Sequence, residues 1–130
     1  MSGESSIITF RDLETWRVGM DLVVAVYGLT RLLPDSERFV LAAQMRRGAL
    51  SIPANVAEGQ RRRIPRVDLN HVSIARGSEG ELETQIELAR RLGFVEAEAA
   101  GKVLELAGRV RQLLNGLRRS IARVHRLHLE

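Results

Sequence analysis

The sequence predicts an all-α protein, an up-and-down four-helix bundle formed by one domain over residues 1–130. Hydrophobic residues make up 45% of the chain and aromatic residues only 4%, a composition typical of a helical core of Leu, Val, Ile and Ala. Four long segments repeat apolar residues at spacings of three and four, and short segments with Pro or Gly separate them. Short connections make neighbouring helices antiparallel. Residues 1–9 are expected to be disordered.

The first helix is expected to begin near Asp12, a short acidic residue that can cap free amides, and to end before Pro34. Its main apolar stripe comprises Leu13, Trp16, Met20, Val23, Tyr27 and Thr30. A second stripe on a neighbouring face comprises Leu22, Val26, Leu29 and Leu33. Because one stripe is enough for packing inside a bundle, the excess apolar surface predicts contacts beyond the monomer.

The second helix is predicted from about Glu37 to about Arg62. Its core stripe comprises Leu41, Met45, Ala49, Ile52 and Val56. Pro53 lies inside this pattern and removes one backbone hydrogen bond, but the apolar spacing persists on both sides of it. We therefore expect a kinked but continuous helix, with Gly59 loosening its last turn.

The third helix is predicted from Pro65 to Leu92, because proline is favourable at a first helical position and Gly93 can stop the helix. Its predicted inward stripe is Ile74, Ser78, Leu82, Ile86 and Ala89, with a packed or hydrogen-bonded His71 one turn earlier. The small residues Gly77, Ser78 and Gly80 predict close approach of another backbone.

The fourth helix is predicted from Glu96 to Leu127, and it carries the most regular apolar pattern in the chain. Its stripe comprises Val103, Ala107, Val110, Leu114, Leu117, Ile121 and Val124. The alternating spacing of four and three continues over three heptads, as in the seam of a helical bundle.

Several classes of chemistry are not expected. The chain has no Cys, which rules out disulfides and thiolate metal sites. It has no phosphate-binding glycine loop, no dinucleotide-binding turn and no nucleophile elbow. The dense glutamates at 79–87 are not accompanied by the Glu-x-x-His pairs of di-iron bundles. We expect no catalytic residue, no metal and no cofactor. With no leader pattern and no membrane-spanning apolar stretch, we expect a cytoplasmic protein that does not contact a membrane.

Polar residues lie among the core positions of the second and third helices. They are Gln44, Arg46, Arg47, Ser51, Asn55 and Glu58 in the second helix, and Ser78, Glu81 and Glu83 in the third. Burial of such groups is costly unless they are paired, so we expect a structural network across the bundle or across an oligomer interface. A ligand site is the alternative.

Positive charge is concentrated in two segments. The formal net charge is +4, and 19 of the 20 basic residues are Arg. The first group comprises Arg61, Arg62, Arg63 and Arg66, and the second comprises Arg109, Arg111, Arg118, Arg119, Arg123 and Arg126. Concentrated arginine predicts phosphate contacts with RNA or DNA without reading of base sequence. The alternatives are a solvated face with ordinary ion pairs, and a GC-rich genome that favours Arg over Lys.

Three strings carry a family resemblance: FRDLETW at residues 10–16, QMRRGALSIPANVAEG at 44–59 and IARGSEGELETQIELARRLGF at 74–94. Over about residues 10–120 the chain resembles the four-helix-bundle proteins encoded in intervening sequences of large-subunit ribosomal RNA genes. The resemblance implies a homopentameric ring with no enzymatic activity. It also implies a relationship to the accessory protein of diversity-generating retroelements, which binds a reverse transcriptase and nucleic acid. The chain departs from the family at Ile64, where a polar cap is expected, and in the dense arginine run before it.

Two functions are compatible with the sequence. One is an oligomeric, nucleic-acid-binding adaptor, with a reverse transcriptase as a candidate partner. The other is a protein–protein scaffold whose arginines serve folding and assembly only.

Overall fold

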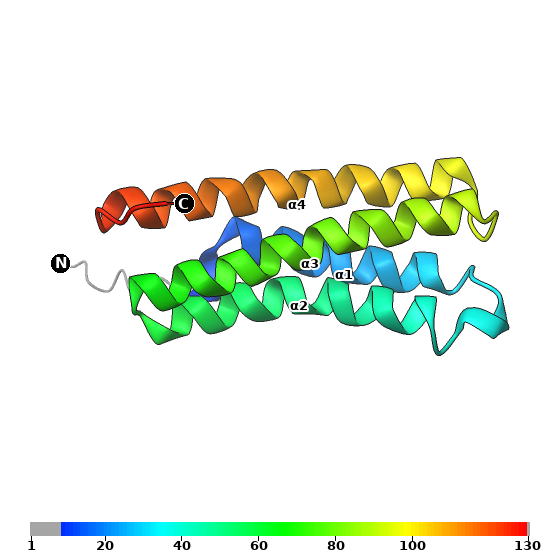
Figure 1. Ribbon diagram of the computed structural model, residues 1–130, viewed down its shortest axis with the longest axis horizontal. Helices are drawn as coiled ribbons and strands as arrows, with labels where there is room; N and C mark the ends of the chain where they lie inside the picture. The colour runs from blue at the N-terminus through cyan, green and yellow to red at the C-terminus, as the bar shows by residue number, and fades with distance from the viewer. Residues whose placement is uncertain (1–8, 130) are drawn as a thin grey trace.

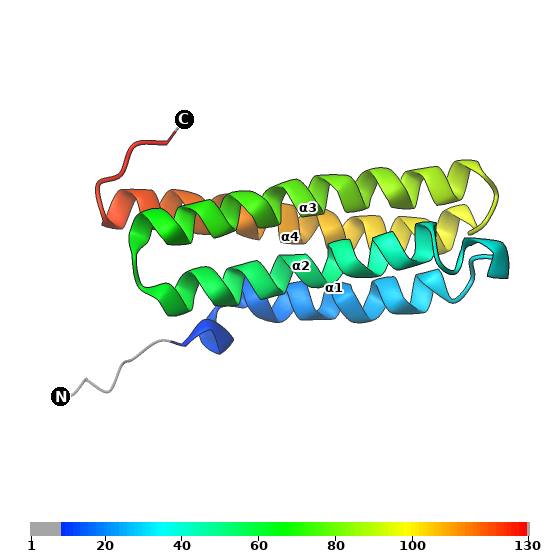
Figure 2. The ribbon, with the colours of Figure 1, turned by 60° about the horizontal axis from the view of Figure 1, so that its bottom comes forward.

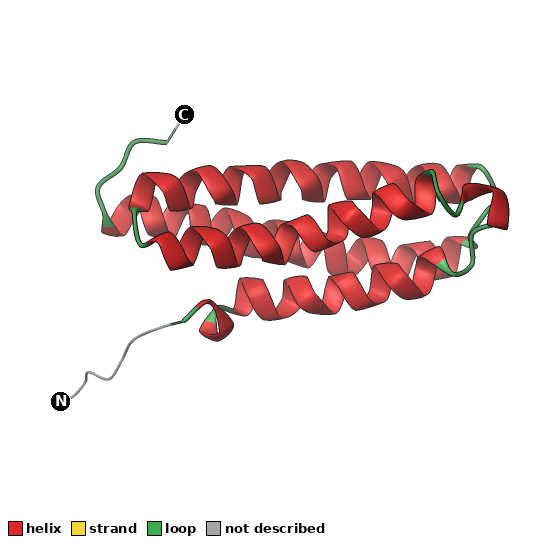
Figure 3. Cartoon of the chain, turned by 90° about the horizontal axis from the view of Figure 1, so that it is seen from below, coloured by secondary structure: helices red, strands yellow, loops and turns green. Residues whose placement is uncertain are grey.

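The computed structural model describes residues 9–129 and shows four long helices lying side by side in alternating directions (Figure 1). The helices are α1 (Glu14–Thr30), α2 (Leu41–Arg62), α3 (Pro65–Arg91) and α4 (Ala97–Val124), with short 3-10 helices η1 (Phe10–Asp12) and η2 (Asp35–Glu37). Each helix packs on the next, and α4 packs back on α1. The described part of the chain contains helices and turns but no strand, as Figure 3 shows. The predicted all-α four-helix bundle is confirmed, and the disorder predicted for residues 1–9 falls outside the described residues except at Thr9.

The core lies along the axis of the bundle and is aliphatic. In α4 the predicted seam is largely confirmed, because Val103, Ala107, Val110, Leu114 and Ile121 are buried. Val124 is 65% exposed, since α4 ends at this residue and not at Leu127 as predicted. The predicted core stripe of α2 is buried in full.

Helix α1 uses its two apolar stripes the other way round from the prediction. Leu22, Val26, Leu29 and Leu33, predicted as the surplus, are buried in the core. Met20 and Tyr27 of the predicted main stripe are each 37% exposed, while Val23 and Thr30 are buried. Both stripes have helical spacing, so periodicity alone does not tell which one faces the bundle. The surplus apolar surface of α1 is real, but it lies around Met20 and Tyr27.

Helix α3 keeps its predicted bounds but turns a different face inward at its middle. The buried residues are Val72, Ala75, Glu79, Leu82, Ile86 and Ala89, which recur every three or four positions without a break. Ile74 is 52% exposed, and Glu79 is only 2% exposed. The predicted inward stripe included Ile74 and did not include Glu79, and the structure corrects both points.

Helix α2 runs unbroken through Pro53, which confirms the predicted continuity, and its ribbon changes direction gently along its length in Figure 2. The pyrrolidine ring packs on α1, where a Cβ added to Gly19 would lie 3.5 Å from Pro53 Cβ. The helix begins at Leu41 and not at Glu37, because Val40 has φ −110° and ψ −90°, outside the helical region. Residues 35–37 form η2 instead.

The close helix approach occurs at Gly59, not at the predicted small residues of α3. A Cβ added to Gly59 would lie 2.9 Å from His71 Cβ and 3.2 Å from Asp68 Cα. A Cβ added to Gly77 or Gly80 would meet nothing within 4 Å, because both lie on the outer surface. Gly59 therefore allows α2 and α3 to pack closely next to the turn that joins them, whereas we had expected it to loosen that turn.

Three helices end on a residue in the left-handed backbone region. After α3, Gly93 has φ +79°, and the amides of Gly93 and Phe94 donate to the carbonyls of Arg90 and Ala89. This is a Schellman cap, and it confirms Gly93 as the predicted stop. After α2 and α4, the left-handed residues are Arg63 (φ 57°) and Arg126 (φ 56°).

Candidate nucleic-acid interface

Nine of the ten arginines in the two predicted groups lie at one end of the bundle, and Arg109 is the exception. Helix α2 ends and α3 begins at the same end at which α4 finishes, on the left of Figures 1 and 2. We define the basic end as residues 9–20, 52–77 and 110–129, and the opposite end as residues 21–51 and 78–109. The two groups are far apart in sequence, and the antiparallel order of α3 and α4 brings them together.

Charge divides sharply between these ends. The basic end contains twelve basic residues, all of them Arg, and four acidic residues, a formal net charge of +8. The opposite end contains eight basic and ten acidic residues, a formal net charge of −2. The formal net charge of +4 is therefore the sum of a strongly positive end and a slightly negative end. The positive electrostatic potential is concentrated at the basic end.

A groove of about 450 Å³ lies between α3 and α4 at the basic end. Arg66 and Arg76 of α3 line it, together with Arg118 of α4. The remaining lining residues are Leu69, Asn70, Ser73, His128 and Leu129, so its described lining includes no carboxylate. The Arg76 Nε donates a hydrogen bond to Asn115 Oδ1 at 2.8 Å, which holds this guanidinium in place. Guanidinium, amide and hydroxyl groups along a groove can donate hydrogen bonds to phosphate oxygens.

Backbone geometry marks the same end. A non-glycine residue in the left-handed region is strained by about 1 kcal/mol relative to glycine. The two non-glycine residues with positive φ in the described chain are Arg63 and Arg126, both predicted from sequence as nucleic-acid contacts. Glycine would fit either turn better, so these positions keep an exposed guanidinium at a cost in stability.

The ten predicted arginines form two sets, of which the first forms ion pairs with glutamates. Arg62 Nε lies 2.8 Å from Glu58, Arg109 lies 2.7 Å from Glu14, and Arg111 pairs with Glu83. The ion-pair alternative therefore holds for these three. The second set is defined by its position at the basic end and comprises Arg61, Arg63, Arg66, Arg118, Arg119, Arg123 and Arg126. Arg118 is half-buried and has an interaction partner, and the others are exposed. The second set forms the candidate interface.

Part of the predicted polar network joins α2 to α3. The Ser51 and Ser78 hydroxyls lie 3.0 Å apart, and Asn55 Nδ2 donates to the Ser51 carbonyl at 2.8 Å and to its hydroxyl at 3.0 Å. The Asn55 Oδ1 shares a hydrogen bond of 2.8 Å with His71 Nδ1, so His71 is the hydrogen-bonded residue that we predicted. Each group has a partner, which makes the network a structural one that fixes the register of the two helices.

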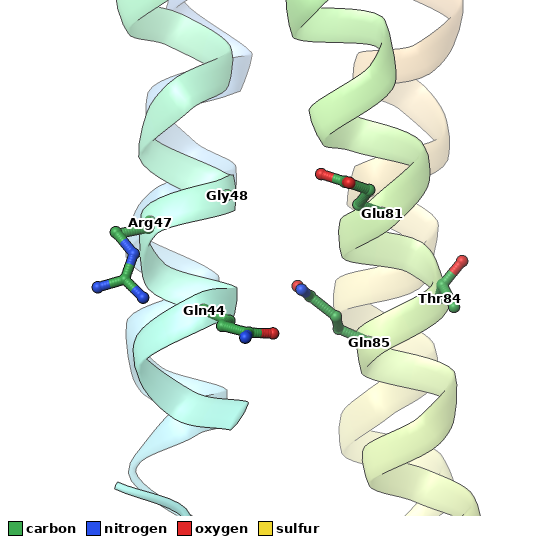
Figure 4. A pocket seen from close by; sticks show the side chains of 6 residues that line it. All are labelled: Gln44, Arg47, Gly48, Glu81, Thr84 and Gln85. Atoms are coloured by element: carbon green, nitrogen blue, oxygen red, sulfur yellow. The ribbon is translucent and has the colours of Figure 1, made fainter. Parts of the chain in front are cut away.

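The other predicted network residues lie elsewhere. Arg46 Nε donates to Thr30 Oγ1 at 2.8 Å, and its guanidinium carbon lies 4.9 Å from the centre of the Tyr27 ring, so Arg46 joins α2 to α1. Glu58 and Glu83 form the ion pairs given above. Gln44, Arg47 and Glu81 line an open groove of about 590 Å³ between α2 and α3, together with Gly48, Thr84 and Gln85 (Figure 4). Gln44, Arg47 and Glu81 are exposed.

Glu79 is a buried acid within the dense glutamates at 79–87, and its burial was not predicted from the sequence. Burial raises its pKa to about 8, and its hydrogen bond to Glu83 and the charge of Glu83 act in the same direction. The pKa of Glu83 is lowered, first by that hydrogen bond and then by its hydrogen bond and attraction to Arg111. Burial therefore favours the protonated form of Glu79, which can donate a hydrogen bond to the carboxylate of Glu83.

Sequence reasoning missed Arg76, Asn70 and Ser73. With Arg66 they recur at spacings of three and four along α3, a signal that places them on one helical face. This face of α3 is polar, so the periodicity of apolar residues does not reveal it. In the part of the chain that the structure describes, no three potential ligands among His, Asp and Glu come together to hold a metal ion. None of the described helices is both long and apolar enough to cross a membrane.

Comparison with known proteins supports the resemblance seen in the sequence. A crystal structure of a protein of unknown function from the S23 ribosomal protein family of Bacteroides thetaiotaomicron superposes with a TM-score of 0.74. It is 22% identical, and the match covers 80% of this chain and 97% of that one, which shows a shared fold. No curated protein matches the chain. Residues 11–116 match the 23S rRNA-intervening sequence protein family, and the chain belongs to that family.

Proposed function

We propose that this protein is a non-enzymatic, cytoplasmic nucleic-acid-binding adaptor that contacts the phosphate backbone through its basic end. The observation that carries the proposal is the convergence of twelve arginines at one end, where the formal net charge is +8. Such a surface attracts RNA or DNA without reading base sequence, and its affinity depends steeply on salt. The family is named for a protein of the 23S rRNA intervening sequence, which is consistent with an RNA-related role.

The proposed binding site for the phosphate backbone of the nucleic acid is the α3–α4 groove. Arg66 and Arg76 are ten residues apart on α3, a distance of about 15 Å along a helix, so one strand can contact both. Arg118 faces them from α4. Arg119 and Arg123 follow on exposed positions of α4 and extend the positive surface beyond the groove.

A salt titration tests the proposal. Binding of mixed-sequence RNA and DNA is measured from 50 to 200 mM salt for the wild type and for a variant with Arg66, Arg119 and Arg123 changed to Gln. Each lost phosphate contact lowers the slope of log affinity against log salt by about 0.9, so we expect a decrease of roughly 2 to 3 and an affinity loss on the order of a hundredfold at 0.1 M salt. The matched control changes Arg31, Arg38 and Lys102 to Gln, which removes the same charge from the opposite end. Equal slopes for the two variants would contradict the proposal, as would a wild type that binds neither polymer at 50 mM salt.

Self-association is the second proposal, and specific surfaces favour it. Met20, Val24 and Tyr27 leave an apolar stripe on the outer face of α1, and Val24 is 71% exposed. Gln85 Oε1, at the groove of Figure 4, is buried without a hydrogen-bond partner among the described residues. A second copy that covers these surfaces would bury the stripe and satisfy the amide, and a homopentamer is the assembly that the family resemblance implies. Sedimentation at micromolar concentration would exclude this if the mass were 14.5 kDa, the mass of one chain.

A reverse transcriptase is the protein partner that we propose for the adaptor. The support is the resemblance to the accessory protein of diversity-generating retroelements. Co-purification with the product of a neighbouring reverse transcriptase gene would test it. If no such gene lies nearby, the scaffold function, in which the arginines serve only folding and assembly, gains ground.

A further inference from the structure

A second hollow at the basic end has a different chemistry from the α3–α4 groove. It has a volume of about 250 Å³ and lies where η1 packs on the end of α2. Its lining comprises Thr9, Phe10, Arg11, Gln60, Arg61 and Arg63. The hollow thus combines an aromatic ring, an amide and three guanidinium groups, and the lining includes no carboxylate.

The aromatic ring in this hollow is held in a defined position. The edge of Phe10 meets Trp16, with ring centres 5.3 Å apart and planes at 70°. Trp16 is itself partly buried against the core, so it anchors the ring to the bundle. The guanidinium carbon of Arg11 lies 5.2 Å from the centre of the Phe10 ring. Phe10 remains partly exposed, and a planar cation and a planar ring are presented together.

We infer that this hollow binds one base of a single-stranded nucleic acid, stacked on Phe10 and the Arg11 guanidinium, with the adjoining phosphates on Arg61 and Arg63. The inference rests on the proposed function and narrows the proposed ligand to single-stranded nucleic acid. Aromatic rings and arginine planes are the surfaces on which unpaired bases stack. Bases in a duplex stack on each other, so a duplex offers only its backbone to the same arginines.

The backbone conformation of Arg63 supports the inference independently. Its left-handed φ of 57° would suit glycine, yet the residue there is an arginine that lines the hollow. Three consecutive exposed arginines, Arg61, Arg62 and Arg63, also end α2. Two of them, Arg61 and Arg63, line the hollow together with the Phe10 ring.

Fluorescence and affinity measurements on a labelled single strand test this. The probe is a 12-nucleotide RNA with a single 2-aminopurine, measured alone and as a duplex with its complement. In Phe10→Leu, which keeps apolar volume but has no ring, we expect about tenfold weaker single-strand binding and loss of the quenching that stacking causes, with duplex affinity changed less than twofold. Phe10→Trp should restore both signals. Phe39→Leu is the matched control, because Phe39 is 81% exposed and lies at the opposite end.

The outcomes separate this inference from the proposed function. If the wild type binds single strand and duplex equally, and Phe10→Leu changes neither, base stacking is refuted while backbone binding stands. If Phe10→Trp fails to restore what Phe10→Leu removes, the role of Phe10 is to pack on Trp16 and the inference is again wrong. If the wild type binds neither RNA, the proposed function itself fails.

Discussion

Helices end in a left-handed backbone turn at both ends of the bundle, but the residue in that turn differs between the ends. At the opposite end, α3 closes on Gly93, the residue that fits a left-handed turn without strain. At the basic end, α2 and α4 close on Arg63 and Arg126, which fit such a turn less well. Backbone geometry alone therefore does not account for the turn residues, because Arg63 and Arg126 add positive charge to the basic end where glycine would relieve the backbone.

Electrostatics follow the same division. At the opposite end Glu87 accepts hydrogen bonds from Arg90 and Arg91, which lower its pKa to about 2. Arginine there is balanced locally by carboxylates. Residues 110–129 of the basic end contain five arginines and no carboxylate, and Arg111 among them pairs with Glu83 of α3. Exposed arginines such as Arg119 and Arg123 attract counterions or a polyanion.

The largest expected effect concerns Glu79, which lies at the carboxylate-rich opposite end. Its pKa is about 8 in the folded protein and 4.5 in the reference state, so the folded state holds a proton that the unfolded chain releases between these pH values. The contribution of Glu79 to stability is therefore fully present below pH 4.5 and is lost as the pH rises through 8. Glu79→Gln keeps a hydrogen-bond donor to Glu83 and removes the titration. We expect it to be more stable than the wild type at pH 8 by about 2 to 3 kcal/mol.

Urea unfolding between pH 4 and pH 9 measures this difference. The two proteins should converge in stability near pH 4, where the wild-type carboxyl is protonated in both states. Glu81→Gln is the control, since Glu81 is exposed two residues away. A constant difference between wild type and Glu79→Gln at every pH would show that Glu79 does not carry a buried proton.

A second substitution tests how tightly the basic end is packed. Gly59→Ala places a Cβ against Asp68 and His71, and we expect it to destabilise the protein by about 2 kcal/mol, as overpacking does. Gly77→Ala introduces the same methyl group on an open helical surface and should stabilise by up to about 1 kcal/mol. Thermal unfolding of the pair gives the sign of each change. If Gly59→Ala were also stabilising, the close approach of α2 and α3 would be disproved.

The smallest expected effect is the most direct test of the comparison between the ends. Arg63→Gly and Arg126→Gly relieve the left-handed backbone, and each should stabilise the protein by about 0.5 to 1 kcal/mol while weakening nucleic-acid binding. Gly93→Ala introduces the strain that the opposite end avoids and should destabilise by a similar amount without changing binding. Chemical unfolding and the salt titration are read on the same samples. Arginine variants that lose stability together with affinity would mean that these residues are structural.

Much of the fold could be predicted from the sequence, because helix periodicity and turn residues act locally. The bounds of α3, the core of α2 and the seam of α4 all follow from such signals. The inward face of α1 could not be predicted, since two apolar stripes have equal spacing and only the partner helices choose between them. The burial of Glu79 could not be predicted either, because it depends on which face α3 turns toward the other helices.

The candidate interface was only partly predictable for a related reason. The arginine-rich segments can be identified in the sequence, but the carboxylates that pair with their arginines cannot. Glu14 and Arg109 are 95 residues apart in sequence, and their ion pair exists only once α1 packs on α4. The same packing that removes Arg109 and Arg111 from the interface adds Arg76 to it.

The relative lengths of α1 and α4 have a dynamic consequence. Thr15 Oγ1 donates to the Leu113 carbonyl at 3.4 Å, so α4 continues for about three turns past the level at which α1 begins. The last of these turns have fewer helical neighbours than the middle of the bundle, and they carry Arg119 and Arg123. Local opening there requires less free energy than global unfolding, so their amide hydrogens should exchange with solvent earlier than those near Val110. A polyanion bound across these turns would slow that exchange, and hydrogen–deuterium exchange would then report occupancy of the basic end without any label on the nucleic acid.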